Sequence, residues 1–360
     1  MPFLKSLTLI LCEACNFACS YCYQKRSPHR LGSELLGAGV PFFYRLLQPQ
    51  AVVRFYGGEP LLEWELLRET VERLEKQRQT DDKSLRYSLT TNGSLLDPAI
   101  IDYLDRFRFW IMLSFDGLAQ SVGRRAGSLE PLLDSIRMIG ERPGIDLAVN
   151  AVFTPQTVGM LADSMRYIAG LGVMKITYSF SAMECWNEPD LNLLEEQLLV
   201  LGLFAVECQR KNGRQPFMNL RKDDSPRQGL FACRAGQDRL AVAADGQVWG
   251  CFIFPDFFRG QENTREFDRF CFGPLQEFIT GYPESHHRLV RHYETLVSDY
   301  FHTPDGLCAT CPELLECSVC PVTAAMSGSY AVLGKIPSHF CHLRRVEKKV
   351  MGRLAQKGGW

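Results

Sequence analysis

The sequence predicts an α/β fold in two parts, an open partial barrel of parallel strands followed by a smaller cysteine-rich domain. As far as about residue 180, short apolar segments alternate with amphipathic helical segments, a pattern typical of parallel β–α–β units. Eight of the fourteen cysteines lie after residue 230, where Gly, Pro and Phe are also frequent. The first observation predicts the barrel, and the second predicts a separate region that bound metal stabilises.

The expected barrel strands are short runs rich in Val, Ile, Phe and Leu, and the expected helices have apolar residues every three or four positions. The strands are residues 7–11, 51–56, 85–90, 108–114, 146–153 and 174–180, and the helices are 61–78, 98–106, 130–140 and 157–170. A proline after Asp97 and another after Thr154 are typical of helix starts. Six strands suit a partial (β/α)6 barrel, in which functional sites gather at the carboxyl ends of the strands.

Composition divides the chain into four segments. They are a barrel at 1–180, a polar bridge with a helix near 191–210 at 181–232, a cysteine-rich domain at 233–345, and a C-terminal helix and tail at 346–360. Between Cys233 and Cys341 we expect few helices and few core-forming elements, so that metal would hold this region together. We expect the last helix, from about residue 342 to 355, to present its basic residues to solvent.

Charge and hydropathy argue against several classes of partner. Forty basic and forty-one acidic residues leave almost no net charge, so neither nucleic acid nor an anionic membrane is a predicted partner. The sequence has no recognisable signal peptide and no apolar stretch near the ~20 residues that span a bilayer. Many cysteines without a secretion signal are typical of a reducing compartment, where thiols hold metals. We therefore predict a soluble, cytoplasmic protein.

Three cysteines, Cys15, Cys19 and Cys22, lie on one short loop with three and then two residues between them. A cubane iron–sulfur cluster takes four thiolates, so three would leave one iron free for a ligand that is not protein. Short cysteine spacings also occur in zinc sites, disulfides and buried cores, although closed zinc sites prefer four ligands in two pairs. Cys12 ends an apolar strand and is expected to be a small core residue.

Glycine and polar residues follow three of the predicted strands. The segments are Gly57-Gly58-Glu59-Pro60, Thr90-Thr91-Asn92-Gly93 and Ser114-Phe115-Asp116-Gly117. Two adjacent glycines let backbone groups approach a ligand without a Cβ in the way, but each segment alone is also typical of a simple turn. Asn150 in the fifth strand is a further candidate. Arg124 and Arg125 could pair with a carboxylate or could be exposed loop residues.

The cysteine loop, with Tyr21 before its third cysteine, resembles that of the radical SAM enzymes, and the three strand-end segments resemble the GGEP, TNG and SxDG segments of that family. The resemblance implies a [4Fe–4S] cluster on the loop, whose free iron binds the amino and carboxylate groups of S-adenosylmethionine (SAM). It also implies reductive cleavage of SAM to methionine and a 5′-deoxyadenosyl radical that abstracts hydrogen from a substrate. The implied cluster ligands are Cys15, Cys19 and Cys22, and the candidate SAM-binding residues are Tyr21, Gly57, Gly58, Glu59, Thr91, Asn92, Ser114, Asp116 and Asn150. No catalytic acid or base is identified.

A second set of cysteines lies in the C-terminal region, where two CxxC pairs are typical of metal sites, zinc sites included. The full pattern resembles the SPASM domain of radical SAM peptide maturases, except that two residues rather than three precede Cys320. This resemblance implies two auxiliary [4Fe–4S] clusters, one on Cys308, Cys311, Cys317 and Cys341, and one on Cys233, Cys251 and Cys320. Cys271 is the candidate fourth ligand of the latter; otherwise that corner is open and Cys271 is a buried core residue. Cys185 and Cys208 are expected to be structural.

The family resemblance implies a maturase that modifies a ribosomally made peptide, with a thioether or carbon–carbon crosslink as the typical product. The closest rival is an anaerobic sulfatase maturase, but such enzymes have an aspartate base directly after the cysteine that corresponds to Cys251, where this chain has Phe252. Asp256 could substitute for that base. A zinc-stabilised binding protein without turnover is the non-enzymatic alternative.

The expected partners of a maturase are a peptide or protein substrate and a reductant such as flavodoxin or ferredoxin. Because the first predicted ligand is already Cys15, we expect no peptide-recognition domain before the barrel. A leader peptide would then bind to a separate protein or to the bridge at 181–232.

Overall fold

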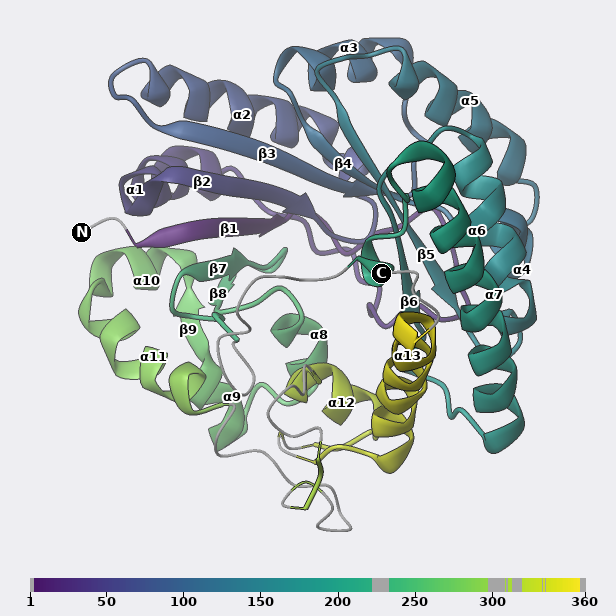
Figure 1. Cartoon of the computed structure of the whole chain (residues 1–360). Helices are drawn as coiled ribbons and strands as arrows, with labels where there is room; N and C mark the ends of the chain where they lie inside the picture. Colours follow the sequence, from purple (N-terminus) through teal and green to yellow (C-terminus); the bar gives the residue numbers. More distant parts are fainter. Residues whose placement is uncertain are drawn as a thin grey trace.

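The described residues form one nine-stranded sheet in the order β6-β5-β4-β3-β2-β1-β7-β8-β9 (Figure 1). The computed structural model describes residues 3–221, 233–296, 308, 310–312, 319–331, 333 and 335–356. Strands β1 to β7 run parallel, whereas β8 and β9 pair antiparallel. The sheet curves, and the helices of the N-terminal half cover its outer face (Figure 1). The predicted α/β fold with a partial barrel is therefore confirmed.

The six barrel strands lie where the apolar segments predict them. They are β1 (Leu4–Ile10), β2 (Leu47–Tyr56), β3 (Ser84–Thr91), β4 (Trp110–Ser114), β5 (Asp146–Phe153) and β6 (Ile176–Phe180). In β1 all residues but one are buried, because helices cover one face of a parallel sheet and the barrel interior covers the other. This burial on both faces explains why the strands read as apolar runs rather than as an alternating pattern.

Four predicted helices are present as α2 (Trp64–Arg78), α3 (Pro98–Arg106), α5 (Leu129–Gly140) and α6 (Leu161–Gly170). Helix α3 begins as expected, since the Asp97 carboxylate accepts a hydrogen bond from the Ile100 amide at 2.8 Å. Helix α6 begins later than expected, because Thr154 and Thr157 first form a hydrogen-bonded turn. The sequence did not indicate α1 (Val40–Leu46) or α4 (Gln120–Gly123), which are short.

The sheet continues beyond the barrel, which the sequence did not predict. Strand β7 (Arg239–Val242) pairs parallel with β1, and β8 (Gln247–Trp249) and β9 (Cys271–Pro274) follow it as an antiparallel extension. The cysteine-rich region is thus joined to the first barrel strand by backbone hydrogen bonds. This arrangement places it next to the loop that follows β1, which carries Cys15, Cys19 and Cys22.

The expectation of few helices and little core between Cys233 and Cys341 is wrong. This region contains α8 (Phe254–Phe258), α9 (Arg265–Phe270), α10 (Leu275–Gly281), α11 (Glu284–Thr295) and α12 (Pro321–Ser327). They surround an aromatic core that includes Trp249, Phe258, Phe270 and Tyr293, all at most 2% exposed. The Trp249 and Phe258 rings stack with centroids 5.6 Å apart. Aromatic burial therefore contributes to the stability of this region.

Helices α7 (Glu188–Asn212) and α13 (Ser338–Gln356) lie side by side (Figure 1). Gly202 of α7 allows the contact, because a Cβ there would collide with the Leu354 side chain. The last helix does not present all of its basic residues to solvent without a partner. Lys349 and Arg353 both form ion pairs with Glu195 of α7. Among the described helices, none has the length and apolar composition needed to cross a membrane.

Candidate active site

A cavity of about 410 Å³ opens at the carboxyl-terminal half of the barrel strands, where the parallel topology predicts a site. Its barrel walls are Tyr56, Gly57 and Gly58 after β2, Thr90, Thr91 and Asn92 at β3, Ser114 at β4, Asn150 and Val152 at β5, and Ser179 and Phe180 at β6. The sheet register explains this convergence, because β4 and β5 place Ser114 directly beside Asn150.

All three cysteines of the N-terminal loop line this cavity. The Cys15 thiol accepts hydrogen bonds from the Phe17 amide at 3.4 Å and from the Asn92 side chain at 3.9 Å. Burial raises the pKa of Cys19 and of Cys22, and the neighbouring thiols raise both further. Bare thiolates are therefore unfavourable here, and a bound metal cluster would relieve that penalty. The donors fit a cluster that needs three protein thiolates and one open corner.

The described residues do not place three or more His, Cys, Asp or Glu side chains in the arrangement of a site for a single metal ion. The three loop thiols instead share the cavity wall with residues from five strands. Cys12 lies apart from the cavity, buried, with its thiol donating to the Glu59 carbonyl at 3.2 Å. Its predicted role as a core residue is confirmed.

Gly57 and Gly58 are required by the cysteine loop itself. A Cβ at Gly57 would collide with the Cys12 carbonyl, and a Cβ at Gly58 would collide with the Ala14 carbonyl. The Gly58 amide donates to the Cys12 carbonyl at 2.9 Å, so the two backbones run in contact. Gly57 also has φ of +145°, which favours glycine. The glycines thus dock the end of β2 against the residues that precede Cys15, while also lining the cavity.

Glu59 has a different position from the predicted ligand-contacting one. Its side chain is fully buried and does not belong to the cavity wall. The carboxylate accepts hydrogen bonds from the Asn92 amide at 2.7 Å, the Thr91 hydroxyl at 2.7 Å and the Leu61 amide at 3.1 Å. Burial raises the pKa of Glu59 to about 7, although these hydrogen bonds oppose the shift. The residue joins the end of β2 to the end of β3, and so fixes Thr91 and Asn92 at the cavity.

Asp116 also lies behind the wall, where it organises two residues that reach the cavity. It is fully buried and accepts hydrogen bonds from the Tyr21 hydroxyl at 2.6 Å, Arg124 at 2.9 Å and the Val152 amide at 2.8 Å. Tyr21 and Arg124 both line the cavity. The Nε atom of Arg124 is buried and has no hydrogen-bond partner among the described residues. Of the two candidate arginines, Arg124 lines the cavity and Arg125 does not.

Of the other residues that the sequence singled out, Asn92 and Asn150 line the cavity and Arg125 does not. Asn92 is nearly buried and donates to the Asn16 side chain at 2.8 Å, which ties β3 to the cysteine loop. The Asn150 side chain accepts hydrogen bonds from Thr177 and Ser179 of β6, at 2.9 and 3.1 Å. Arg125 instead donates to the Asn16 carbonyl at 3.3 Å, outside the cavity lining.

In the second cysteine set, Cys233, Cys251 and Cys320 interact electrostatically with one another. Burial raises the pKa of Cys251 to about 12, and the nearby Cys320 and Cys233 thiols add to the shift. The grouping agrees with the one that the spacing resemblance implies. Cys308 and Cys311 share a turn, in which the Cys311 amide donates to the Cys308 carbonyl at 3.1 Å. Cys341 packs beside the small core of Val319, Ala324 and Ile336, and Cys317 lies outside the described residues.

Cys271 has other neighbours than the predicted cluster. It begins β9, and its thiol donates to the Gln247 side chain at 3.2 Å. Burial raises the pKa of Cys271 to about 12, and the charges that add to the shift are those of Asp245 and Asp268 rather than those of other thiols. Cys271 is thus a buried strand residue whose thiol bonds to Gln247, and its role as a cluster ligand stays a prediction.

Several residues at the cavity were not indicated by the sequence. Ile253, Thr323 and Met326 close the cavity from the C-terminal region. Tyr23 and Tyr56 also line it, with their hydroxyl oxygens 2.7 Å apart. These residues come together only through contacts between segments distant in the sequence, so no local motif marks them. Asp256, which the sequence offered as a substitute base, does not line the cavity but lies near Cys22 and Tyr23, and burial raises its pKa to about 6.

Comparison with known proteins agrees with this geometry. Residues 9–168 match the radical SAM superfamily. The chain is 23% identical over 278 residues to the radical SAM cyclopropyl synthase TigE of Paramaledivibacter caminithermalis, covering 69% of this chain and 57% of TigE. It is 34% identical over 128 residues to the cysteine-type anaerobic sulfatase-maturating enzyme of Clostridium perfringens, covering 32% of this chain and 34% of that enzyme. The chain thus spans only part of each relative.

The fold is similar to that of anSMEcpe, solved with bound AdoMet, with a TM-score of 0.74, 18% identity and 98% of each chain covered. The same protein was also solved with AdoMet and the Cp18Cys peptide, at a TM-score of 0.71. This likeness extends over both parts of the chain, the barrel and the cysteine-rich region. Residues 9–168 therefore carry a radical SAM domain, and the chain as a whole shares the two-part fold of anSMEcpe.

Proposed function

We propose that this protein is a radical SAM/SPASM maturase that cleaves SAM and abstracts hydrogen from a ribosomally made peptide, forming a thioether or carbon–carbon crosslink. One observation carries the proposal: a single cavity gathers Cys15, Cys19 and Cys22 with residues from the ends of the barrel strands. Residues of the C-terminal region form its other wall. A cofactor on the thiols would thus face a space that both parts of the chain enclose.

Cys15, Cys19 and Cys22 would hold the [4Fe–4S] cluster, and SAM would bind beside them in the cavity. Bound there, the two groups supply the electron and the carbon radical that start the reaction. Arg124 provides a positive charge at the cavity wall, and Asp116 fixes its orientation at 2.9 Å. Thr91, Asn92, Ser114 and Asn150 present hydrogen-bonding groups to the same space. The glycines Gly57 and Gly58 keep the cysteine loop closed against β2.

The second cysteine set would hold auxiliary clusters. The convergence of Cys233, Cys251 and Cys320 supports a cluster there with three protein ligands and an open corner. Cys308, Cys311, Cys317 and Cys341 are the proposed ligands of the other. The peptide would enter between the barrel and the C-terminal region, since Ile253, Thr323 and Met326 of that region line the cavity together with the barrel residues. Its partners would include a one-electron reductant such as flavodoxin or ferredoxin.

Anaerobic reconstitution tests the proposal. Full-length protein should bind iron, become brown and release 5′-deoxyadenosine from SAM under a strong reductant. The triple variant Cys15→Ala/Cys19→Ala/Cys22→Ala should retain auxiliary iron but release no 5′-deoxyadenosine. The matched control Cys185→Ala/Cys208→Ala removes two thiols outside the cavity and should behave as wild type. Colourless protein that holds zinc, or cleavage that survives in the triple variant, would refute the proposal.

A second function, anaerobic sulfatase maturation by formylglycine formation, is favoured by two observations. The chain is 34% identical to a sulfatase-maturating enzyme over 128 residues, and Asp256 is a buried carboxyl near Cys22 and Tyr56, with a pKa raised to about 6 by burial. Incubation with SAM, reductant and a cysteine-containing sulfatase peptide separates the two functions. Formylglycine that depends on Asp256 would establish the second, whereas its absence beside normal SAM cleavage favours the first.

A further inference from the structure

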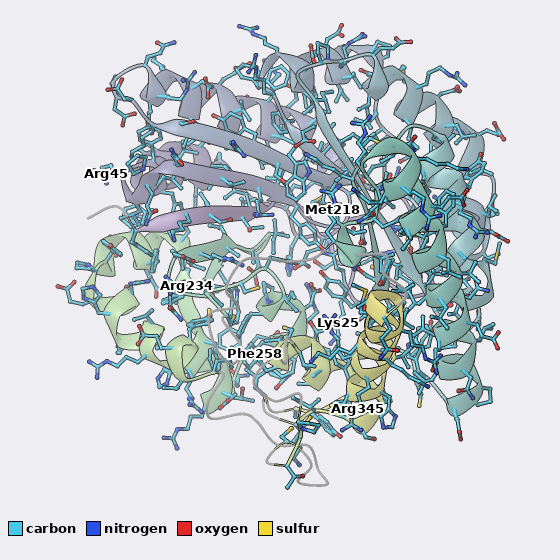
Figure 2. All side chains as sticks on the ribbon, viewed as in Figure 1. Lys25, Arg45, Met218, Arg234, Phe258 and Arg345 are labelled. Carbon is cyan, nitrogen blue, oxygen red and sulfur yellow. The ribbon has the colours of Figure 1, made fainter. Side chains whose placement is uncertain are left out.

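The residues that follow Cys22 are held by the C-terminal part of the chain. The Lys25 amide donates to Asp256 Oδ1 at 3.1 Å, and Lys25 Nζ donates to the Arg259 carbonyl at 3.4 Å. Asp256 lies in α8 and Arg259 directly follows this helix. Figure 2 labels Lys25 between the sheet and the C-terminal helices. Lys25 therefore contacts α8 and the residue that follows it.

The two ends of the cysteine loop meet at one carboxylate, that of Glu13, which lies two residues before Cys15. The Ser27 hydroxyl donates to Glu13 Oε2, and His29 Nδ1 lies 3.4 Å from the same oxygen. Glu13 Oε1 pairs with the Arg259 guanidinium. The Glu13 amide also donates to the His29 carbonyl at 3.1 Å. The Glu13 carboxylate thus joins the two ends of the cysteine loop, and Arg259 is its partner from the C-terminal region.

A third contact holds the start of the segment that follows Cys22. The Tyr23 hydroxyl is 2.7 Å from the Tyr56 hydroxyl, and the Tyr56 ring packs on the Phe252 ring with centroids 4.8 Å apart. Phe252 directly follows Cys251, so this contact reaches the second cysteine set. The segment therefore contacts residues 252–259 directly at Lys25 and indirectly through Tyr56 and Glu13.

The groups that make these contacts are shielded from water, so the loss of a partner is costly. The side chains of Glu13 and Arg259 are 9% and 23% exposed, and Asp256 is 7% exposed. In such surroundings a lost partner leaves polar groups unsatisfied, and solvent does not readily replace it. The loop conformation thus depends on Arg259 and Asp256 more than it would on an exposed ion pair.

We propose that Arg259 and Asp256 are positioning residues for the N-terminal metal centre, through which the C-terminal region sets the geometry of the loop that carries Cys15, Cys19 and Cys22. The inference rests on the proposed function, because it requires that the loop holds the cluster that binds SAM. Neither residue lines the cavity; both act through Glu13 and the backbone of residue 25. Groups that orient metal ligands in this way commonly change affinity without contacting the metal.

The test compares reconstituted full-length variants by electron paramagnetic resonance of the reduced protein, with and without SAM, and by equilibrium dialysis of SAM. Arg259→Met should change the SAM-responsive signal and raise the Kd for SAM about tenfold, the usual size for loss of an orienting group. Arg259→Lys should recover part of both effects. Asp256→Asn retains an oxygen acceptor for the Lys25 amide and should resemble wild type, whereas Asp256→Ala should resemble Arg259→Met.

Arg142→Met is the matched control, because Arg142 also joins two segments through an ion pair, with Asp102, and is 30% exposed. It should leave the signal and the Kd unchanged. Wild-type values in both Arg259→Met and Asp256→Ala would overturn the inference while leaving the proposed function intact. A wild-type protein without any SAM-responsive signal would overturn both. If circular dichroism shows that Arg259→Met is unfolded, Arg259→Lys and Asp256→Ala decide the outcome.

Discussion

Asp116 and Arg124 form a buried ion pair, with Oδ1 and Nη2 2.9 Å apart and side chains 0% and 7% exposed. Arg124 lines the cavity of the three loop cysteines, and Asp116 lies behind its wall. Removal of Asp116 would leave a buried cation without its partner, which typically costs about 3–5 kcal/mol. We therefore expect Asp116→Ala to lower the free energy of unfolding by that amount, measured by urea denaturation. Asp134→Ala, at the exposed pair with Arg137, should change it by less than about 1 kcal/mol. Equal losses in the two variants would contradict the buried pair.

The ionisation of Glu59 should make the free energy of unfolding depend on pH. Its folded pKa of about 7 lies above the ordinary value of 4.5, so the folded state binds this proton more tightly than the unfolded state does. The stabilisation is fully present below about pH 4.5 and is lost as the pH rises through about 7, by roughly 3 kcal/mol at most. Glu59→Gln removes this titration. We expect the stability difference between Glu59→Gln and wild type to grow in favour of the variant from pH 4.5 to 8. A difference that does not change with pH would contradict the assignment.

Gly58→Ala should disturb the cysteine loop. The added Cβ would collide with the Ala14 backbone, which cannot move without shifting Cys15. We expect Gly58→Ala to lose iron from the N-terminal loop after reconstitution, measured as loss of the SAM-responsive resonance signal. Gly140→Ala is the control, because a Cβ there meets no atom within 4 Å and alanine is favoured in a helix by about 0.5–1 kcal/mol. Normal iron in Gly58→Ala would show that the close backbone contact is dispensable.

The contributions of the Tyr23 and Tyr56 hydroxyls to the stability of the protein should depend on each other. Tyr23→Phe or Tyr56→Phe alone leaves the other buried hydroxyl without this partner, which costs about 1–3 kcal/mol. The double variant removes both groups, so its loss of stability should be smaller than the sum of the single losses. Thermal denaturation of the four proteins measures this double-mutant cycle. Strict additivity would mean that the 2.7 Å contact contributes nothing.

Much of the site could be predicted because its parts follow barrel strands or the cysteine loop. Cys15, Gly57 and Asn92 are distant in the chain, yet parallel strands bring their carboxyl ends to one edge, and each residue belongs to a recognisable local segment. Asn150 could be proposed for the same reason. The sequence could not show that Glu59 and Asp116 lie behind the cavity wall, since their burial depends on hydrogen bonds to other strands.

The C-terminal region was harder to predict for physical reasons. Helices α8 and α9 are too short to show an amphipathic period, and Trp249, Phe258 and Phe270 form a core through contacts between these short elements. Cys271 resembled a ligand because of its place between other cysteines, whereas its strand directs the thiol to Gln247. The Arg259 contact with Glu13 joins residues 246 positions apart, which no local motif can indicate.

The most direct measurement of the central claim is electron–nuclear double resonance of the reduced, reconstituted protein mixed with SAM that carries 15N at its amino group. If the three loop thiols leave one iron open to SAM, a 15N coupling should appear in wild type and in Cys185→Ala/Cys208→Ala. It should vanish in Cys15→Ala/Cys19→Ala/Cys22→Ala. A reduced cluster that shows no nitrogen coupling in wild type, or a coupling that persists in the triple variant, would contradict the account.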